Sequence, residues 1–347
     1  MFEHVADVTI PTGTVSPWLG NLAVCWLDTR NITYMGIIQG NNVHIGHWDN
    51  KTDGPVSWDT IHAVASSPNE RSSEITALGI VHPNARNYPI VVVGTVSDIQ
   101  IYDVRKCSSK VVFKISLETA LKMELAMDIN RDIGPFCRGV TCNDNTILVG
   151  THSGEIVVIM CNGDSNFSTK RNLKEHTHPI ADIATCRYDE ITISGSANGE
   201  VIVWQKPVKG VQARIATKQH ISVMNILRKQ VIIGTMRGIV QLYSVATGAL
   251  MCETTAHARV VTSISIAPES AYVLTASEDG VFIVSKLHTR KPHAYQLEYR
   301  FSKKDSNSAI VGAQFTNGRG STLAIAAYDH PHISTFKIFK KSAAKSE

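Results

Sequence analysis

Short apolar runs alternate with turn residues along the whole chain, and residues 196–204 (SANGEVIVW) give the pattern in its simplest form. A small residue and the pair Asn198-Gly199 precede an apolar run that ends in Trp204. Asn-Gly is a preferred pair for two-residue turns between antiparallel strands. The segment therefore predicts one half of a tight β hairpin.

The same pattern occurs seven times. Each copy is an apolar strand that ends in Gly or Ala, a short turn with Gly, Asn, Asp or Ser, and a second apolar strand. The small residues that end the first strands are Gly36, Gly94, Gly150, Gly195, Gly234, Ala276 and Ala327. A strand unit that returns every roughly 40 to 50 residues is typical of a β-propeller, in which each repeat is one blade.

Further strands flank most copies. Apolar segments such as 181–186 (ADIATC) and 262–267 (TSISIA) lie upstream, and more polar segments such as 211–216 (VQARIA) lie downstream. We expect four strands per unit, graded from an apolar first strand near the axis to a polar last strand at the solvent edge. Because one twisted sheet buries both faces only when neighbours stack on it in a ring, we predict an all-β, seven-bladed propeller.

The chain ends are predicted to close this ring. Residues 5–10 alternate like a strand but belong to no blade of their own, and the last copy ends near Phe339 without a fourth strand. We expect residues 5–10 to pair as the outer strand of the last blade and to cover its free edge. The prediction is a single propeller over residues 1–339, followed by a disordered basic tail at 340–347 (KKSAAKSE).

One insertion interrupts the repeat. The stretch 116–132 lengthens the spacing between the second and third copies to 56 residues, and leucines recur in it every four residues from Leu117 to Leu125. This spacing predicts a short helix over 117–131 between blades 2 and 3. Such a helix either covers an edge of its own blade or inserts into a groove of a partner protein.

Several positions resemble the WD-repeat family. Its blades carry a His before the inner strand, an Asp or Asn in the central turn and a Trp at the end of the third strand, joined through a Ser or Thr. Asn198 and Trp204 match the fourth copy, and His257 and Asp279 match the sixth, where Ser285 stands in the Trp place. The resemblance implies a structural hydrogen-bonded tetrad role for His257 and Trp204.

The resemblance to one member of this family extends over nearly the whole chain in the same order. It is carried by TGALMCETTAHARVVTSISIA (247–267), LTASEDGVFIVSKL (274–287), NITYMGIIQG near the start and AAYDHPHISTF near the end. It implies a seven-bladed cytoplasmic WD-repeat propeller.

Composition narrows the class of protein. Hydrophobic residues make up 43% of the chain, and 34 Lys and Arg exceed 30 Asp and Glu by four, spread along the sequence apart from the basic tail. So small an excess predicts neither a nucleic-acid nor an acidic-lipid partner. The sequence shows no secretory pattern, no apolar run of membrane-spanning length, and seven cysteines without a CxxC pair. We expect a cytoplasmic monomer that does not insert into membranes.

Some spacings are compatible with metal or acid-base chemistry. The candidates are His176 with His178, His330 with His332, where Asp329 can add an oxygen ligand, and the adjacent carboxylates Glu278 and Asp279. A metal needs three or four ligands, and Asp is favoured in hairpin turns for turn geometry alone. With no Walker loop, GxSxG elbow or HExxH motif either, we expect no catalytic residue, metal or cofactor.

The candidate binding residues follow from the geometry of the ring. Turns between second and third strands, and loops entering first strands, share one face, which places Asn198, Arg237, Arg259, Asp279 and Asp329 together. The resemblance implies peptide binding on that face, and an Arg there can hold a carboxylate or phosphate through a fork of donors. The alternative for the two arginines is a solvated charge.

We therefore predict a non-enzymatic scaffold that binds partner proteins or peptides through its propeller loops. The alternative is a propeller with a small-molecule or catalytic site in the central channel.

Overall fold

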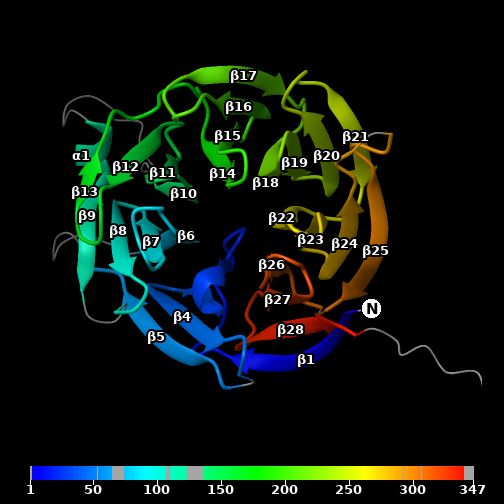
Figure 1. Cartoon of the computed structure of the whole chain (residues 1–347), viewed down its shortest axis with the longest axis horizontal. Coiled ribbons are helices and arrows are strands. Elements are labelled where there is room, and N and C mark those ends of the chain that lie inside the picture. Colours follow the sequence, from blue (N-terminus) through cyan, green and yellow to red (C-terminus); the bar gives the residue numbers. More distant parts are fainter. Residues whose placement is uncertain are drawn as a thin grey trace, which may run out of the picture.

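Seven four-stranded antiparallel sheets stand around a central axis in the computed structural model (Figure 1). The structure describes residues 2–52, 54–64, 74–106, 110–122, 136–290, 292–305 and 307–339. The sheets are numbered below as blades 1 to 7 in chain order. The predicted all-β, seven-bladed propeller is confirmed.

Each blade runs from an inner strand at the axis to an outer strand at the rim. Blade 1 consists of β2 (Ala23–Leu27), β3 (Ile32–Gln39), β4 (Asn42–Asp49) and β5 (Ser57–His62). Blade 2 consists of β6 (Ile75–Val81), β7 (Ile90–Thr95), β8 (Asp98–Asp103) and β9 (Val111–Ser116). Blade 3 consists of β10 (Cys137–Asn143), β11 (Thr146–Thr151), β12 (Ile156–Cys161) and β13 (Phe167–Thr169). Blade 4 consists of β14 (Ile180–Cys186), β15 (Ile191–Ser196), β16 (Glu200–Trp204) and β17 (Val211–Ala216).

The remaining blades follow the same order. Blade 5 consists of β18 (Ile221–Leu227), β19 (Gln230–Thr235), β20 (Ile239–Ser244) and β21 (Leu250–Thr255). Blade 6 consists of β22 (Val261–Ala267), β23 (Tyr272–Ser277), β24 (Val281–Leu287) and β25 (Leu297–Lys304). Blade 7 consists of β26 (Ile310–Phe315), β27 (Thr322–Ala327), β28 (His332–Ile338) and β1 (Phe2–Thr9). A 3-10 turn, η1 (Asp28–Arg30), follows β2, and a short helix, α1 (Leu117–Leu121), follows β9.

The small residue that marks each copy of the repeat is explained by packing between blades. A Cβ added at Gly195 would lie 2.8 Å from Met224 Sδ, and one at Gly234 would lie 2.6 Å from Val261 Cγ1. Met224 and Val261 belong to the inner strand of the following blade. Side chains are therefore excluded where the second strand meets the next blade, which keeps the sheets in close contact.

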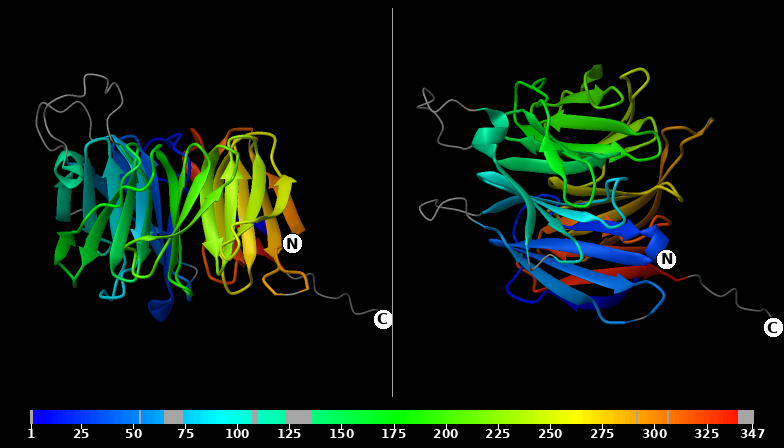
Figure 2. Two further views of the ribbon diagram at one scale, coloured as in Figure 1. Left: turned by 90° about the horizontal axis from the view of Figure 1, so that it is seen from above. Right: turned by 60° about the vertical axis from the view of Figure 1, so that its left-hand side comes forward.

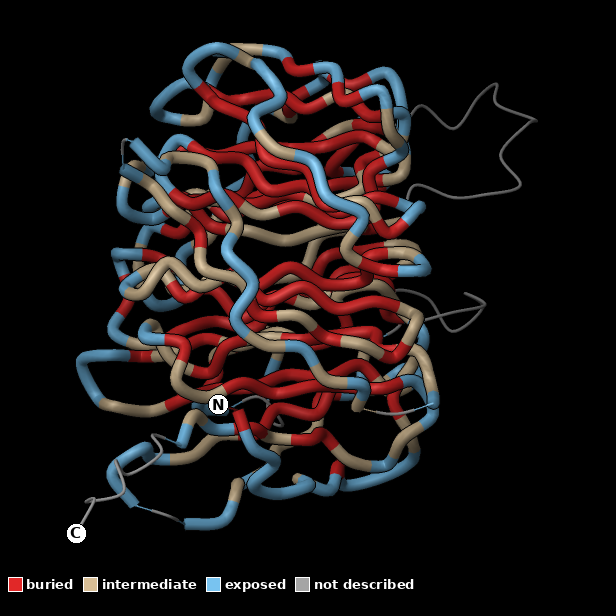
Figure 3. Tube along the Cα trace, turned by 90° about the vertical axis from the view of Figure 1, so that its right-hand side faces the viewer, coloured by how far each residue is buried: buried red, intermediate tan, exposed pale blue. Residues whose placement is uncertain are grey.

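Burial across a blade peaks in its two middle strands. All six residues of β15 and of β19 are buried, whereas five of the six in outer strand β21 are exposed. The inner strand β14 is only partly buried because one edge of it borders the channel. The expected apolar-to-polar gradient thus begins at the second strand, and exposed chain lies at the outer edge and in the loops (Figure 3).

The chain ends close the ring as predicted. Strand β1 pairs antiparallel with β28, from Phe2 opposite Ile338 to Thr9 opposite His332. Phe2 is buried in the cluster that joins blades 6 and 7. Closure therefore uses both the hydrogen bonds of a fourth strand and apolar packing at its start.

Polar side chains of the inner strands link neighbouring blades. The Ser222 hydroxyl donates to the Val261 carbonyl at 2.6 Å, and the Thr262 hydroxyl donates to the Ile310 carbonyl at 2.6 Å. The Asp182 carboxylate accepts the backbone N–H groups of Ile183 and Met224, each at 2.8 Å. Burial raises the pKa of Asp182 to about 6 even though both bonds favour the charged form. These bonds couple successive blades around the channel.

The insertion between blades 2 and 3 begins as a helix. Ser116 caps α1 by accepting the N–H of Thr119, and Leu117 and Leu121 are buried in the core of blades 2 and 3. This first turn therefore covers a blade edge. The rest of the predicted helix, residues 123–131, and the predicted tail 340–347 lie outside the described residues.

Candidate functional site

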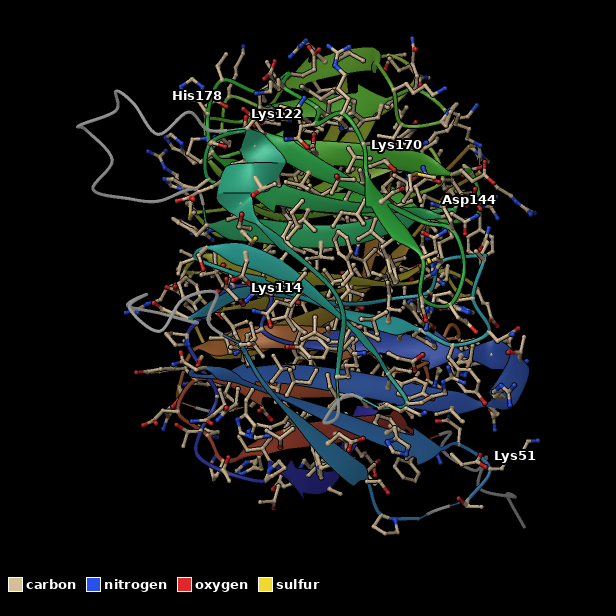
Figure 4. The ribbon with its side chains drawn as sticks, turned by 90° about the vertical axis from the view of Figure 1, so that its left-hand side faces the viewer. Lys51, Lys114, Lys122, Asp144, Lys170 and His178 are labelled. Carbon is tan, nitrogen blue, oxygen red and sulfur yellow. The ribbon has the colours of Figure 1, made fainter. Side chains whose placement is uncertain are left out.

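The five predicted binding residues lie on one face of the ring. Asn198, Arg237, Asp279 and Asp329 follow the second strands of blades 4, 5, 6 and 7, and Arg259 precedes β22. We call this the upper face; it carries α1 at the top of the left view in Figure 2. In Figure 4, Lys122 and His178 project from this face, and Asp144 and Lys51 from the opposite, lower face.

The two aspartates and the asparagine are bonded within the protein. Asp279 accepts the N–H groups of Ala258 and Val281, both at 2.9 Å. Asn198 accepts from Ser196 and from the N–H of Glu200, and Asp329 accepts the Thr14 hydroxyl at 2.9 Å. These hydrogen bonds hold loop geometry, and they engage both oxygens of Asp279, Asn198 Oδ1 and one oxygen of Asp329.

Arg237 and Arg259 are different, because both are exposed and neither guanidinium pairs with an acceptor in the described part of the chain. Their loops are in contact: a Cβ added at Gly238, where φ is +78°, would lie 2.1 Å from the His257 carbonyl oxygen and 2.7 Å from that of Arg259. Glycine is thus required beside Arg237, and the two cations share one corner of the upper face between blades 5 and 6. We call this corner the arginine pair.

Trp204 belongs to a hydrogen-bonded network in blade 4. Its indole Nε1–H donates to Ser194 Oγ at 2.9 Å, and Ser194 Oγ lies 2.7 Å from His176 Nε2. Because the indole only donates, the serine hydroxyl is free to donate to His176, whose Nδ1 lies 3.2 Å from Glu200 Oε2. Burial lowers the pKa of His176, which favours the neutral ring that this arrangement needs.

His257 forms a shorter network in blade 6. Its Nε2 lies 2.9 Å from Thr275 Oγ1, and its Nδ1 lies 3.4 Å from Asp279 Oδ2 without forming a hydrogen bond. Ser285 stands where blade 4 has Trp204, so no indole joins this network. His257 and Trp204 thus belong to separate blades and separate networks.

The candidate metal and acid-base groups have other contacts. His330 Nε2 lies 3.2 Å from Ser308 Oγ, and His178 Nδ1 lies 3.0 Å from Asn198 Nδ2. Within the described ranges, no three His, Cys, Asp or Glu side chains gather as a metal would require. His176, which the spacing paired with His178, is instead part of the blade 4 network.

The N-terminal segment 10–22 covers the upper entrance of the channel, and its blue chain lies inside the ring in Figure 1. The N–H of Gly20 donates to Thr262 O in blade 6 at 2.9 Å, and that of Asn21 donates to Val311 O in blade 7 at 3.0 Å. Trp18 packs against the core of blades 1 and 2, whereas Leu19 packs against that of blades 5 and 6. These neighbouring side chains therefore contact opposite sides of the ring. We call residues 10–22 the entrance segment.

Below the entrance segment lies a cavity of about 300 Å³, and a second of about 530 Å³ lies toward the lower face. The two share lining residues, including Val24 and Asn225, so they follow one another along the axis. We call the second cavity the lower mouth. It is lined by Trp26, Arg187 and Tyr188, which sequence reasoning missed. Trp26 is separated from the other two by three blades' length of chain, so no local spacing could have indicated the group.

In the described ranges, no helix has the length and apolar composition needed to cross a lipid bilayer. The six described cysteines are free thiols, of which only Cys252 is not buried.

Comparisons with known proteins agree with this architecture. A family model described as WDR54 matches residues 1–339. WD repeat domain 54 of Rattus norvegicus is 28% identical over 349 residues, covering 97% of this chain and 99% of the relative. WD repeat-containing protein 54 of Mus musculus is 27% identical over 332 residues, covering 91% and 93%. A chain in the structure titled "Crystal Structure of Mitotic Checkpoint Complex" aligns with a TM-score of 0.72 and 14% identity, covering 97% of this chain and 96% of that chain. The last match shows the fold alone.

Proposed function

The chain belongs to the WDR54 family, and from this premise we propose that it is a non-enzymatic scaffold that binds partner proteins through the loops of its upper face. Membership confirms the resemblance to WD-repeat proteins, which generally act as interaction scaffolds. We place the protein in the cytoplasm, where thiols stay reduced, and the free thiols of the described cysteines support this. We also propose that it is a monomer.

The observation that carries the proposal is the arginine pair. Arg237 and Arg259 are both exposed and stand on loops that contact each other, while Asn198, Asp279 and Asp329 on the same face are bonded within the protein. A guanidinium can bind a carboxylate or phosphate through two parallel hydrogen bonds. The partner segment is therefore acidic, with Arg237 and Arg259 as anchors and the other three residues holding the loops that present them.

A catalytic or small-molecule site in the channel has weaker support. Among the described residues, the ionisable side chains lining the 300 Å³ cavity are Arg138 and Asp182. Both oxygens of Asp182 already accept backbone N–H groups. Acid-base chemistry needs a positioned acid or base within reach of the substrate, and an arginine stays protonated. Asp182 is therefore the one such group in the described lining of this cavity.

The test is affinity purification from cells of the wild type and of an Arg237→Glu, Arg259→Glu variant. We expect the variant to lose specific partners, because charge reversal repels an acidic segment. A Lys170→Glu, Arg171→Glu variant makes the same change in net charge on exposed residues after β13 and is expected to keep those partners. Circular dichroism spectra of the three proteins check that each variant is folded before partners are compared.

Identical partner lists from the wild type and both variants would contradict binding through the arginine pair. Loss of partners in the Lys170→Glu, Arg171→Glu variant alone would place the interface on the rim instead.

A further inference from the structure

The lower mouth has the composition of a binding site rather than of a covered core. Tyr188 is 68% exposed although it borders a cavity of about 530 Å³, and Trp26 on the opposite side is half-buried. Tyr, Trp and Arg are the residue types that contribute most to binding energy at protein interfaces. The volume lies within the range of sites that hold a ligand-sized group.

The Trp26 ring lies against a turn of blade 7. A Cβ added at Gly318 would lie 3.0 Å from the Trp26 ring and 2.5 Å from Glu269 Oε1. Trp26 therefore packs over the backbone of Gly318 in the turn after β26. An aromatic side chain has only two rotatable χ angles, so it loses little conformational entropy when a ligand packs against it.

Arg187, in the turn after β14 of blade 4, lines the lower mouth together with Cys25 of blade 1. Its charge counteracts part of the rise that burial causes in the pKa of Cys25. The same charge acts on His82 of blade 2 and on Cys142 of blade 3. No carboxylate in the described part of the chain pairs with Arg187.

Two acidic residues line the same cavity, and they are not equivalent. Glu269 Oε2 lies 3.3 Å from Arg319 Nε, so its charge is already countered. Asp28, in η1 at the lower rim visible below the ring in the left view of Figure 2, has no ion pair among the described residues. The mouth thus presents one cation and one anion without internal partners, Arg187 and Asp28.

We propose that the lower mouth is a second docking site, which takes an acidic peptide segment of a partner protein. One carboxylate of the segment binds the Arg187 guanidinium, and the adjoining side chain packs between Trp26 and Tyr188. Asp28 repels a further carboxylate, so the site selects a single acidic residue with apolar or basic neighbours. The entrance segment covers the opposite end of the channel, which leaves the lower mouth as the end where a side chain can enter.

Both the arginine pair and the lower mouth are proposed to bind an acidic segment of a partner protein. The residues of the lower mouth lie on the opposite face of the ring from the arginine pair. Either proposed site can therefore be wrong while the other is right.

The test uses an array of ten-residue peptides in which one glutamate is fixed at the centre and its neighbours vary among apolar, basic and acidic residues. Each peptide is paired with a copy that has glutamine at the centre. The full-length wild type is expected to bind glutamate peptides with apolar or basic neighbours about tenfold more tightly than their glutamine copies.

Three variants locate the binding on the molecule. Arg187→Gln is expected to remove the preference for glutamate, and Asp28→Asn is expected to improve binding of peptides with two acidic residues. Lys229→Gln is the matched control, because Lys229 is exposed in the turn after β18 and does not line the cavity. It is expected to bind like the wild type.

The proposal is wrong if the wild type binds no array peptide, if glutamate and glutamine copies bind equally, or if Arg187→Gln binds like the wild type. It is also wrong if the Arg237→Glu, Arg259→Glu variant loses these peptides, because binding would then belong to the upper face.

Discussion

The upper and lower ends of the channel differ in what their polar side chains are bonded to. At the upper end, Asn21, Asp329 and Asp279 bind the protein's own backbone and side chains, and the entrance segment lies across the opening. At the lower end, Arg187 and Asp28 have no ion-pair partner in the described chain. The upper end is therefore built mainly for stability apart from the arginine pair, and the lower end keeps groups available for a ligand. Substitutions should cost folding free energy at the upper end and binding at the lower.

The largest stability effect is expected from Asn21→Ala. The Asn21 side chain is buried, donates to the carbonyls of Ser16 and Ile38 at 2.9 Å, and accepts the N–H of Ile38 at 2.7 Å. Removing it leaves buried backbone groups unsatisfied, which costs about 3 kcal/mol of unfolding free energy. Urea unfolding followed by fluorescence measures the loss. Asn41→Ala, at an exposed turn, is the control, and equal stability of both variants would show that the entrance segment is not held by Asn21.

The next largest losses of unfolding free energy are expected from substitutions in the two histidine networks near the upper end. Ser194→Ala removes the atom shared by Trp204 and His176, so two buried polar groups lose a partner, at about 2 kcal/mol. Thr275→Val removes the partner of His257 alone and should cost about 1 kcal/mol. Unfolding free energies of both variants test the order. A Thr275→Val loss as large as that of Ser194→Ala would mean that the indole bond adds nothing.

The same histidines predict a pH dependence. Burial lowers the pKa of His176 and of His257 below the unfolded value of 6.5, so the unfolded chain binds more protons than the folded one as the pH falls below 6.5. Stability must therefore be complete above that pH and decrease on acidification. We expect a His176→Gln, His257→Gln variant to be less stable at pH 7.5 but to lose less between pH 7.5 and 5.5 than the wild type. Parallel losses in the two proteins would show that these rings do not titrate on unfolding.

Most of the fold could be predicted because its signals are local and repeated. Each hairpin is encoded by adjacent residues, and the small residue at its turn recurs because the next blade packs there, as at Gly195 and Gly234. Residues 5–10 were recognisable as a closing strand because a seventh blade lacked one. The helical insertion was visible from leucine spacing, although only its first turn is described.

The contacts of the candidate site residues could not be predicted from the sequence, because they depend on side-chain directions and on closure of the ring. A turn position can be predicted, but the contacts of its side chain cannot. Asn198 and Asp279, which we predicted as binding residues, accept hydrogen bonds from Ser196 and from the N–H of Ala258. His176 was paired with its sequence neighbour His178, whereas its partner Ser194 lies in the next hairpin. The lower mouth joins blade 1 to blade 4, and only closure of the ring brings Trp26 and Arg187 together.

The smallest effects on unfolding free energy are expected from the unpaired arginines of the two ends, Arg187 and Arg237. Arg187→Gln should change the unfolding free energy by less than about 0.5 kcal/mol, because an exposed cation without a carboxylate partner contributes little to folding. Arg237→Gln should behave the same way at the upper face, since it is also exposed and unpaired in the described chain. Urea unfolding of both variants beside Asn21→Ala gives the contrast in one experiment. If Arg187→Gln instead lost as much stability as Asn21→Ala, Arg187 would contribute to folding as Asn21 does, and the lower end would be stabilised like the upper.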